Sequence, residues 1–163
     1  MRNKLIFSIF FIFLLFILYS CDNPNKKVQI NEVIAKTFIE SWNAHDINKL
    51  LSLFAENCLY EEVASGRRYS TKEGIEGYAK STLSGVPDSK FEIVTLMADN
   101  EKAMVEWIWK GTNSVGWEEM GIPATGKYFE IRGVSVMLIE NNLIRRNSDY
   151  WDWNSFITGI GVN

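Results

Sequence analysis

A carboxylate, an amide and an indole alternate along the last predicted strand of the chain. Asp149 lies two residues after Asn147 and two before Trp151, and side chains on a strand alternate between its faces. The same alternation places Arg145 on this face and Ile144 on the opposite one. If the face lines an apolar cavity, burial would raise the pKa of Asp149 and fit it for proton transfer. Asp149 is therefore the candidate general acid/base.

A second carboxylate and a phenol share one face of a predicted strand over residues 58–63. Tyr60 and Glu62 are two residues apart on it, so both can point into the same cavity. Two carboxylates brought close together push their pKa values apart, which gives one base and one acid. We expect Tyr60 and Glu62 to be catalytic partners of Asp149 that hold a bound oxygen or a water molecule.

Two tryptophans alternate with charged residues in a predicted strand over residues 102–112. Trp107 and Trp109 share one face, and Glu106 and Lys110 share the other. Since solvent takes the charged face, the indoles should point inward. We expect a substrate-binding surface for a flat, lipophilic molecule, made of Trp107, Trp109, Asn147 and Trp151.

A structural interpretation of the same residues stays open. Asp149 could be a hydrogen-bonded structural acid paired with Arg145 or Arg132, and the tryptophans could be core residues. Cys58 is expected to be a small buried residue and not a nucleophile. The single histidine, His45, lies beside a predicted helix cap and has no second histidine with which to share a metal ion, so no metal site is expected.

The order of predicted elements indicates a segregated α+β fold. Amphipathic periodicity and capping residues predict helices over 30–42, 47–54 and 72–83. Alternation predicts strands over 58–63, 90–98, 102–112 and 128–139, with a bulge or a bend at Gly133. A hairpin turn at Asn141 and Asn142 leads into the last strand. Residues 66–68 are expected to form a loop in which Arg67 and Arg68 are solvated charges. Residues 113–127 are expected to fold over an opening or pack on a partner. The fold class is thus three helices on one face of a curved, mostly antiparallel sheet.

The N-terminus has the pattern of a secretory signal. Arg2 and Lys4 precede an apolar run over residues 5–18, too short for a comfortable membrane span. Residues 18–21, Leu-Tyr-Ser-Cys, resemble the lipobox of bacterial lipoproteins, which implies acylation of Cys21, with palmitate among the attached lipids. We expect a signal peptide over 1–20, a tether over 21–27 and one domain over 28–163. The product is an exported, lipid-anchored protein of the bacterial cell envelope; an uncleaved anchor helix is the alternative.

The charge and the cysteine content exclude some partners and frameworks. The formal net charge is −3, which argues against a nucleic-acid partner. With Cys21 acylated, only Cys58 remains, so no disulfide framework is expected.

Three segments resemble the SnoaL-like polyketide cyclases of the nuclear transport factor 2-like superfamily: residues 38–46, residues 121–127 (Gly-Ile-Pro-Ala-Thr-Gly-Lys) and residues 149–152 (Asp-Tyr-Trp-Asp). The resemblance implies a cone-shaped sheet closed by three helices around an apolar pocket. It further implies chemistry without a cofactor, and a homodimer formed through the outer face of the sheet.

The resemblance also bears on the site residues. Asp149 falls where SnoaL and the related epoxide hydrolases have their acid/base aspartate, and Tyr60 and Glu62 fall where those hydrolases hold water. Trp107 and Trp109 replace the arginine and aspartate that epoxide opening needs. The implied function is binding of a small lipophilic molecule, with cyclisation, isomerisation or hydration through Asp149. The alternative is a non-catalytic ligand-binding or protein-interaction domain.

Overall fold

The computed structural model describes residues 24–162. The predicted signal peptide, Cys21 and the first residues of the predicted tether lie outside the described residues. The described chain begins in α2 (Pro24–Ala44), so residues 24–27, which we expected in a tether, are helical. No helix among the described residues is long and apolar enough to cross a membrane.

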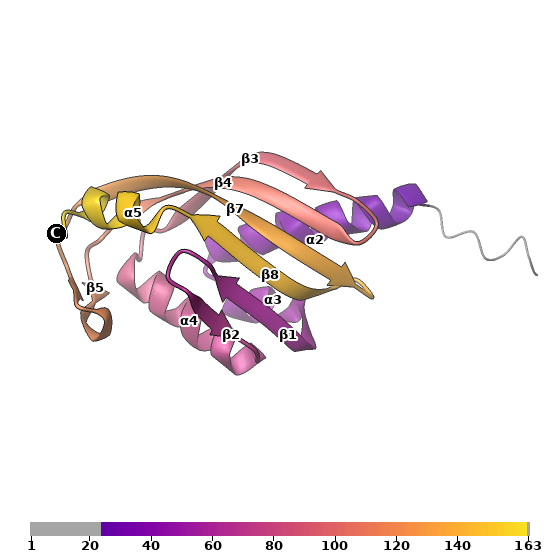
Figure 1. The fold of residues 1–163 in the computed structure, drawn as a ribbon, viewed down its shortest axis with the longest axis horizontal. Coiled ribbons are helices and arrows are strands. Elements are labelled where there is room, and N and C mark those ends of the chain that lie inside the picture. Colours follow the sequence, from indigo (N-terminus) through magenta and orange to yellow (C-terminus); the bar gives the residue numbers. More distant parts are fainter. Residues whose placement is uncertain (1–23, 163) are drawn as a thin grey trace, which may run out of the picture.

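A six-stranded, curved sheet forms one layer of the molecule (Figure 1). Its order is β2-β1-β8-β7-β4-β3, and all neighbours are antiparallel except the parallel pair of β1 and β8. The mostly antiparallel α+β fold is therefore confirmed. The strands are β1 (Phe54–Glu62), β2 (Arg67–Tyr69), β3 (Lys90–Ala98), β4 (Lys102–Thr112), β7 (Tyr128–Glu140) and β8 (Leu143–Trp151).

Helices cover the inner face of the sheet, and α2 packs along β3 and β4. Two short helices are capped by side chains: Asp46 accepts from the Lys49 backbone N–H at 2.8 Å before α3 (Ile47–Ser52), and Thr71 accepts from Gly74 at 3.1 Å before α4 (Lys72–Gly85). Phe54 was predicted in the second helix, but it is fully buried as the first residue of β1.

A C-terminal helix, α5 (Trp153–Ile160), was missed by the sequence prediction. Asp152 caps it, accepting from Asn154 at 2.9 Å and from Ser155 at 3.1 Å, and Gly161 ends it with a φ of 74°. The helix buries Phe156 and Ile160, and it lies at the end of β8 in Figure 1. The described chain thus has four α-helices where three were predicted.

The segment 113–127 packs against α4 at one end of the molecule (Figure 1). It contains the short pair β5 (Gly116–Trp117) and β6 (Ile122–Pro123) around the 3-10 turn η1 (Glu118–Met120). Trp117 and Ile122 are buried, and the Trp117 indole donates to the Ser81 carbonyl of α4 at 2.9 Å.

Three local predictions about strands were wrong. Residues 67–69 form the edge strand β2 instead of a loop, because Tyr69, Arg68 and Arg67 pair with residues 60–62. Gly133 makes no bulge: it pairs in register with Trp107 and Trp151, and a Cβ at this position would overlap the Trp107 ring. The absence of a side chain at Gly133 leaves room for the Trp107 ring.

The register irregularity of the hairpin lies at Arg145 instead. Ile139 pairs with Ile144, but Leu138 pairs with Arg146, so Arg145 is an extra residue in β8. The bulge turns Ile144 inward, where it is fully buried, and leaves Arg145 outside the site. The predicted face of β8 is confirmed from Asn147 onward and is wrong at Arg145. Asn141 and Asn142 turn the hairpin with φ angles of 52° and 63°, as predicted.

Candidate active site

Asp149 lies in the middle of the inner face of the sheet and accepts three hydrogen bonds. The Tyr60 hydroxyl donates to Oδ2, and Oδ1 accepts from the Ser135 hydroxyl and the Asn147 amide, each at 2.7 Å. Ser135 is the residue opposite Asp149 on β7, and Asn147 is opposite Tyr60 on β1. The sheet register itself therefore brings the donors to the carboxylate.

Burial dominates the proton affinity of this group. Asp149 is 6% exposed, and the loss of solvation raises its pKa, while the hydrogen bonds from Tyr60, Ser135 and Asn147 lower it. Burial also raises the pKa of Tyr60 well above its ordinary value, and the neighbouring Asp149 carboxylate adds to the rise. Tyr60 therefore remains a proton donor over the whole physiological pH range.

Ser135 is a site residue that the sequence prediction missed. Its hydroxyl accepts from the Trp107 indole N–H at 2.9 Å and donates to Asp149, so it links the two. It is fully buried. The available signal was alternation, because Gly133, Ser135 and Met137 share one face of β7 and the serine is the only polar one of the three.

An inner chamber adjoins the carboxylate. It has a volume of about 20 Å³, enough for one water molecule. Asp149, Ser135 and Thr82 are among its polar lining residues, and aromatic side chains make most of the remaining wall. These side chains are Phe38, Trp42, Tyr60, Tyr78, Phe91, Trp107, Trp109 and Trp151.

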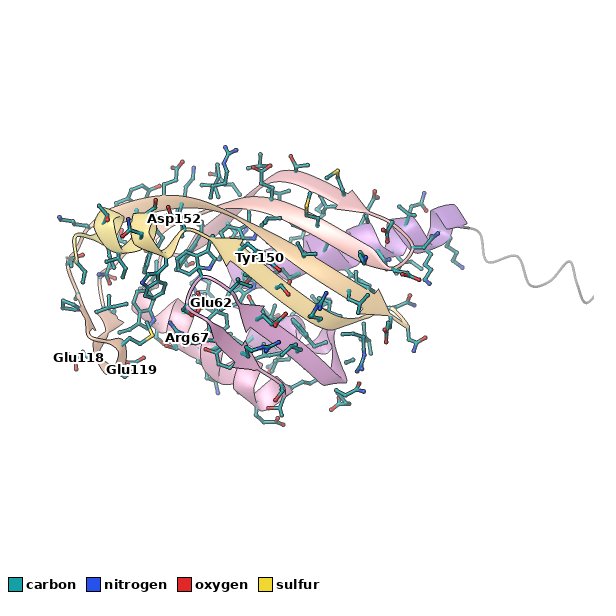
Figure 2. The ribbon with its side chains drawn as sticks, viewed as in Figure 1. Glu62, Arg67, Glu118, Glu119, Tyr150 and Asp152 are labelled. Carbon is teal, nitrogen blue, oxygen red and sulfur yellow. The ribbon has the colours of Figure 1, made fainter. Side chains whose placement is uncertain are left out.

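Glu62 lies beside this chamber without lining it. It pairs with Asp149 in the parallel register of β1 and β8, and it is 2% exposed. Burial raises the pKa of Glu62, against the opposing effects of the Ser65 hydroxyl and the Arg67 guanidinium. Its Oε2 accepts from Ser65 and lies 3.5 Å from Arg67 Nε. Figure 2 labels Glu62 and Arg67 near the end of β8.

A second hollow, here called the vestibule, contains Glu62. Its volume is about 30 Å³, and it shares Tyr78, Thr82, Trp109 and Trp151 with the inner chamber. Arg67 lines it too, with its guanidinium 6.0 Å from the Trp153 ring centroid. Arg67 was expected to be an ordinary solvated charge, which is wrong. The vestibule and the chamber are neighbouring hollows that share these four lining residues, and each is lined by one buried carboxylate.

The predicted site residues are brought together, with one division. Asp149, Tyr60, Trp107, Trp109 and Trp151 line the inner chamber. Asn147 donates to the Asp149 carboxylate without lining the chamber, and Glu62 lines the vestibule. Trp109 also binds outside the chamber, donating from its indole N–H to Ser89 at 2.7 Å. These tryptophans are both core and pocket wall.

The predicted structural alternative for Asp149 named the wrong partners. Arg132 pairs with Glu106 at 3.0 Å on the outer face, and Arg145 pairs with Glu140 at 3.1 Å. Neither arginine reaches the carboxylate. Cys58 is buried and free, and burial raises the pKa of its thiol, as expected for a core residue. His45 is an exposed turn residue with a φ of 54°.

The fold and this pocket define a class of protein: an α+β cone with a buried, hydrogen-bonded carboxylate in an aromatic pocket. Within that class, the SnoaL-like polyketide cyclase model matches residues 32–157, so the chain belongs to this family. No curated protein matches the sequence significantly. In the described part of the chain, no cluster of three His, Cys, Asp or Glu side chains could hold a metal ion.

Solved structures from several bacteria have the same fold. A protein of Jannaschia sp. CCS1, proposed to be a SnoaL-like polyketide cyclase, aligns with a TM-score of 0.76 at 12% identity over 83% of this chain and 94% of its own. A proposed polyketide cyclase of Xanthomonas campestris aligns with a TM-score of 0.72 at 14% identity, over 83% of this chain and 99% of its own. A Catenulispora acidiphila protein with a ketosteroid isomerase-like fold, in complex with trimethylamine, aligns with a TM-score of 0.69 at 18% identity, over 80% of this chain and 93% of its own. At these identities the likeness shows the fold alone.

Proposed function

We propose that this domain binds a small apolar molecule in its aromatic pocket and catalyses proton transfer without a cofactor. The reaction class is a cyclisation, an isomerisation or a hydration, with Asp149 as the general acid/base. The observation that carries the proposal is the buried Asp149 carboxylate, which lines a chamber and whose pKa burial raises. Such a group holds a proton more readily than an ordinary aspartate, so it can accept a proton from a substrate and return it.

The hydrogen bonds give the two oxygens of the Asp149 carboxylate different roles. Ser135 and Asn147 hold Oδ1, and among residues 24–162 only Tyr60 donates to Oδ2. A lone pair of Oδ2 therefore remains for a proton from the substrate or from a water molecule in the chamber. Tyr60 keeps its own proton throughout, so it steadies the carboxylate and does not compete for the transferred proton.

The test uses a reaction common to cyclisation and isomerisation, removal of a proton next to a carbonyl. Exchange of the α-protons of 2-tetralone and cyclohexanone in deuterated water can be followed by NMR. We expect the wild type to accelerate exchange, and Asp149→Asn to lose about 10²- to 10⁴-fold of that acceleration. Glu130→Gln, at an exposed position on the outer face, is the matched control and should exchange as the wild type does. Equal acceleration by Asp149→Asn would overturn the assignment.

A non-catalytic ligand-binding or protein-interaction domain is the second candidate. The small volume of the chamber, about 20 Å³, favours it over turnover of a large substrate beside Asp149. Tryptophan fluorescence reports binding directly, because Trp107, Trp109 and Trp151 line the chamber. Ligand binding without any acceleration of exchange would favour this candidate.

We also propose that Cys21 is acylated and holds the domain at the cell envelope. Support comes from the apolar run and the lipobox-like residues 18–21. Mass spectrometry of the N-terminal peptide should show a lipid on Cys21, and Cys21→Ser should release the protein from the membrane fraction. Retention of the serine variant in membranes would instead favour an uncleaved anchor helix.

Pairing of two copies through the outer face of the sheet is a further proposal. Met97 and Tyr150 are 54% and 46% exposed there, and Met104 and Val134 lie opposite them on neighbouring strands. Native mass spectrometry should give twice the chain mass, and Tyr150→Glu should give the single mass. A wild-type protein of single mass would reject the dimer.

A further inference from the structure

The vestibule contains a carboxylate oxygen that lacks a hydrogen-bond donor. Glu62 Oε2 has Ser65 and Arg67 as partners, but Oε1 is buried and has no partner among the described residues. A buried carboxylate oxygen without a donor is unfavourable, because it has lost water without replacement. This oxygen belongs to a side chain that lines the vestibule. A ligand that supplies a proton donor or a positive charge would satisfy it.

Aromatic rings surround this carboxylate on the side of α5. Trp151 and Trp153 have centroids 5.5 Å apart, Trp153 and Phe156 5.9 Å, and Trp117 and Phe156 5.8 Å. All four line the vestibule. Faces of tryptophan rings attract cations, and the attraction grows when the cation is shielded from water.

The chain itself already places a cation against these rings. The Arg67 guanidinium stands over Trp153 and beside Glu62, although its side chain is 34% exposed. Acidic residues outnumber it in the surroundings: besides Glu62, Glu119 lies 3.4 Å from the Ser81 hydroxyl, and Ser81 lines the vestibule. Figure 2 labels Glu119 on the turn below α5.

We propose that the vestibule is a binding site for the ammonium group of an organic cation, which contacts Glu62 Oε1 and the face of Trp153. The ammonium group is thus the feature by which a ligand of this pocket is recognised. The inference rests on the proposed pocket being a ligand site, but not on proton transfer by Asp149. A ligand bound in this way would place its apolar part against Trp109 and Trp151, which the vestibule shares with the inner chamber.

The test compares two molecules of the same shape and different charge. Choline carries a trimethylammonium group, and 3,3-dimethylbutan-1-ol replaces its nitrogen with carbon. Isothermal titration calorimetry at pH 8, well above the ordinary pKa of a glutamate, should show choline binding at least about 10-fold tighter than the alcohol. Equal or tighter binding of the alcohol would overturn the proposal, because it would show a merely apolar vestibule.

Variants separate the two contacts. Glu62→Gln should weaken choline binding about 10-fold, as loss of a charged partner does, and leave the alcohol unaffected. Glu61→Gln is the matched control, since Glu61 is on the opposite face of β1 and pairs with Arg68, and it should bind choline normally. Trp153→Leu should weaken choline about 5-fold. Unchanged choline binding by both Glu62→Gln and Trp153→Leu would overturn the site.

A further variant tests whether Arg67 competes with the ligand cation. Arg67→Met removes the competing guanidinium, so choline should bind more tightly. Weaker choline binding by Arg67→Met would overturn the proposal, because the guanidinium would then support the ligand and not compete with it. The choline measurements follow binding alone, whereas the α-proton exchange assay follows proton transfer. Failure of the ammonium site is therefore distinguishable from failure of the proposed function.

Discussion

Tyr60 donates its phenolic proton to Asp149 from a strand that runs parallel to the strand of the carboxylate. The two residues are 89 positions apart in the chain, and the β1–β8 pairing alone brings them together. Because Glu62 is opposite Asp149 in the same register, one strand pair positions both buried carboxylates of the pocket.

The free energy of unfolding of the domain should depend on pH because Asp149 is buried. Because the pKa of Asp149 is raised in the folded state, the native protein keeps this proton at pH values where the unfolded chain has lost it. The free energy of unfolding should therefore fall as the pH rises above about 4, the pKa of an ordinary aspartate. Urea unfolding between pH 4 and 8 should show a smaller fall for Asp149→Asn.

The comparison with the variant is necessary because other carboxylates act in both directions. Burial likewise raises the pKa of Glu62, whereas backbone hydrogen bonds lower the pKa values of Asp88 and Asp99. Subtracting the curve of the variant leaves the contribution of Asp149. A difference that grows with pH in favour of the wild type would contradict the raised pKa.

Ser135→Ala should change the pKa of Asp149 while leaving the Asp149 side chain itself in place. The variant removes one donor to Oδ1 and leaves the Trp107 indole N–H without its acceptor, so we expect a loss of about 1–3 kcal/mol in unfolding free energy. Because the lost hydrogen bond stabilised the ionised form, the acidic limb of the pH–rate profile for ketone exchange should move to higher pH. Ser148→Ala, which removes a bond to Glu61 on the other face, should lower stability without moving that limb.

Gly133→Ala should destabilise the domain by about 1–3 kcal/mol, because the new methyl group overlaps the Trp107 ring. Gly77→Ala is the opposite case: it lies in α4, where a Cβ meets no atom within 4 Å, and removing a helical glycine should stabilise by about 0.5–1 kcal/mol. Thermal unfolding of both variants checks the pair. Equal effects of the same sign would contradict the packing seen at Gly133.

Asp152→Ala should loosen α5, because it removes the side chain that accepts from two backbone N–H groups. The expected cost is about 1 kcal/mol, and amide hydrogen exchange should rise over residues 153–160. Asp46→Ala removes the cap of α3 and should raise exchange over residues 47–52 instead. Unchanged exchange in α5 after Asp152→Ala would show that packing of Phe156 alone holds the helix.

Local patterns in the sequence were sufficient for the central strands. Residues 90–98 and 102–112 match the bounds of β3 and β4 in full. Burial alternates along the whole of β4, whereas the register of β3 shifts between Ile93 and Thr95. Alternation also placed Tyr60 with Glu62 and Asn147 with Asp149. These residues are positioned by short-range periodicity, which a sequence displays directly.

Features that depend on distant partners were not predictable in this way. β2 is only three residues long and is a strand because β1 pairs with it. The bulge at Arg145 reverses the face of Ile144, and no local pattern marks it. Arg67 looked like a surface charge until the fold placed it between Glu62 and Trp153. The resemblance supplied the pocket, but the division into chamber and vestibule depends on side-chain packing.

The strand that completes the site is the last of the described strands in sequence and a central one in space. β8 lies between β1 and β7, so the sheet has two unpaired edges in its middle until residues 143–151 arrive. Before that moment Tyr60 and Ser135 are present but have no carboxylate to hold. Assembly of the candidate site and closure of the sheet therefore depend on the same strand, and a chain that ends at β7 lacks the carboxylate that the other site residues contact.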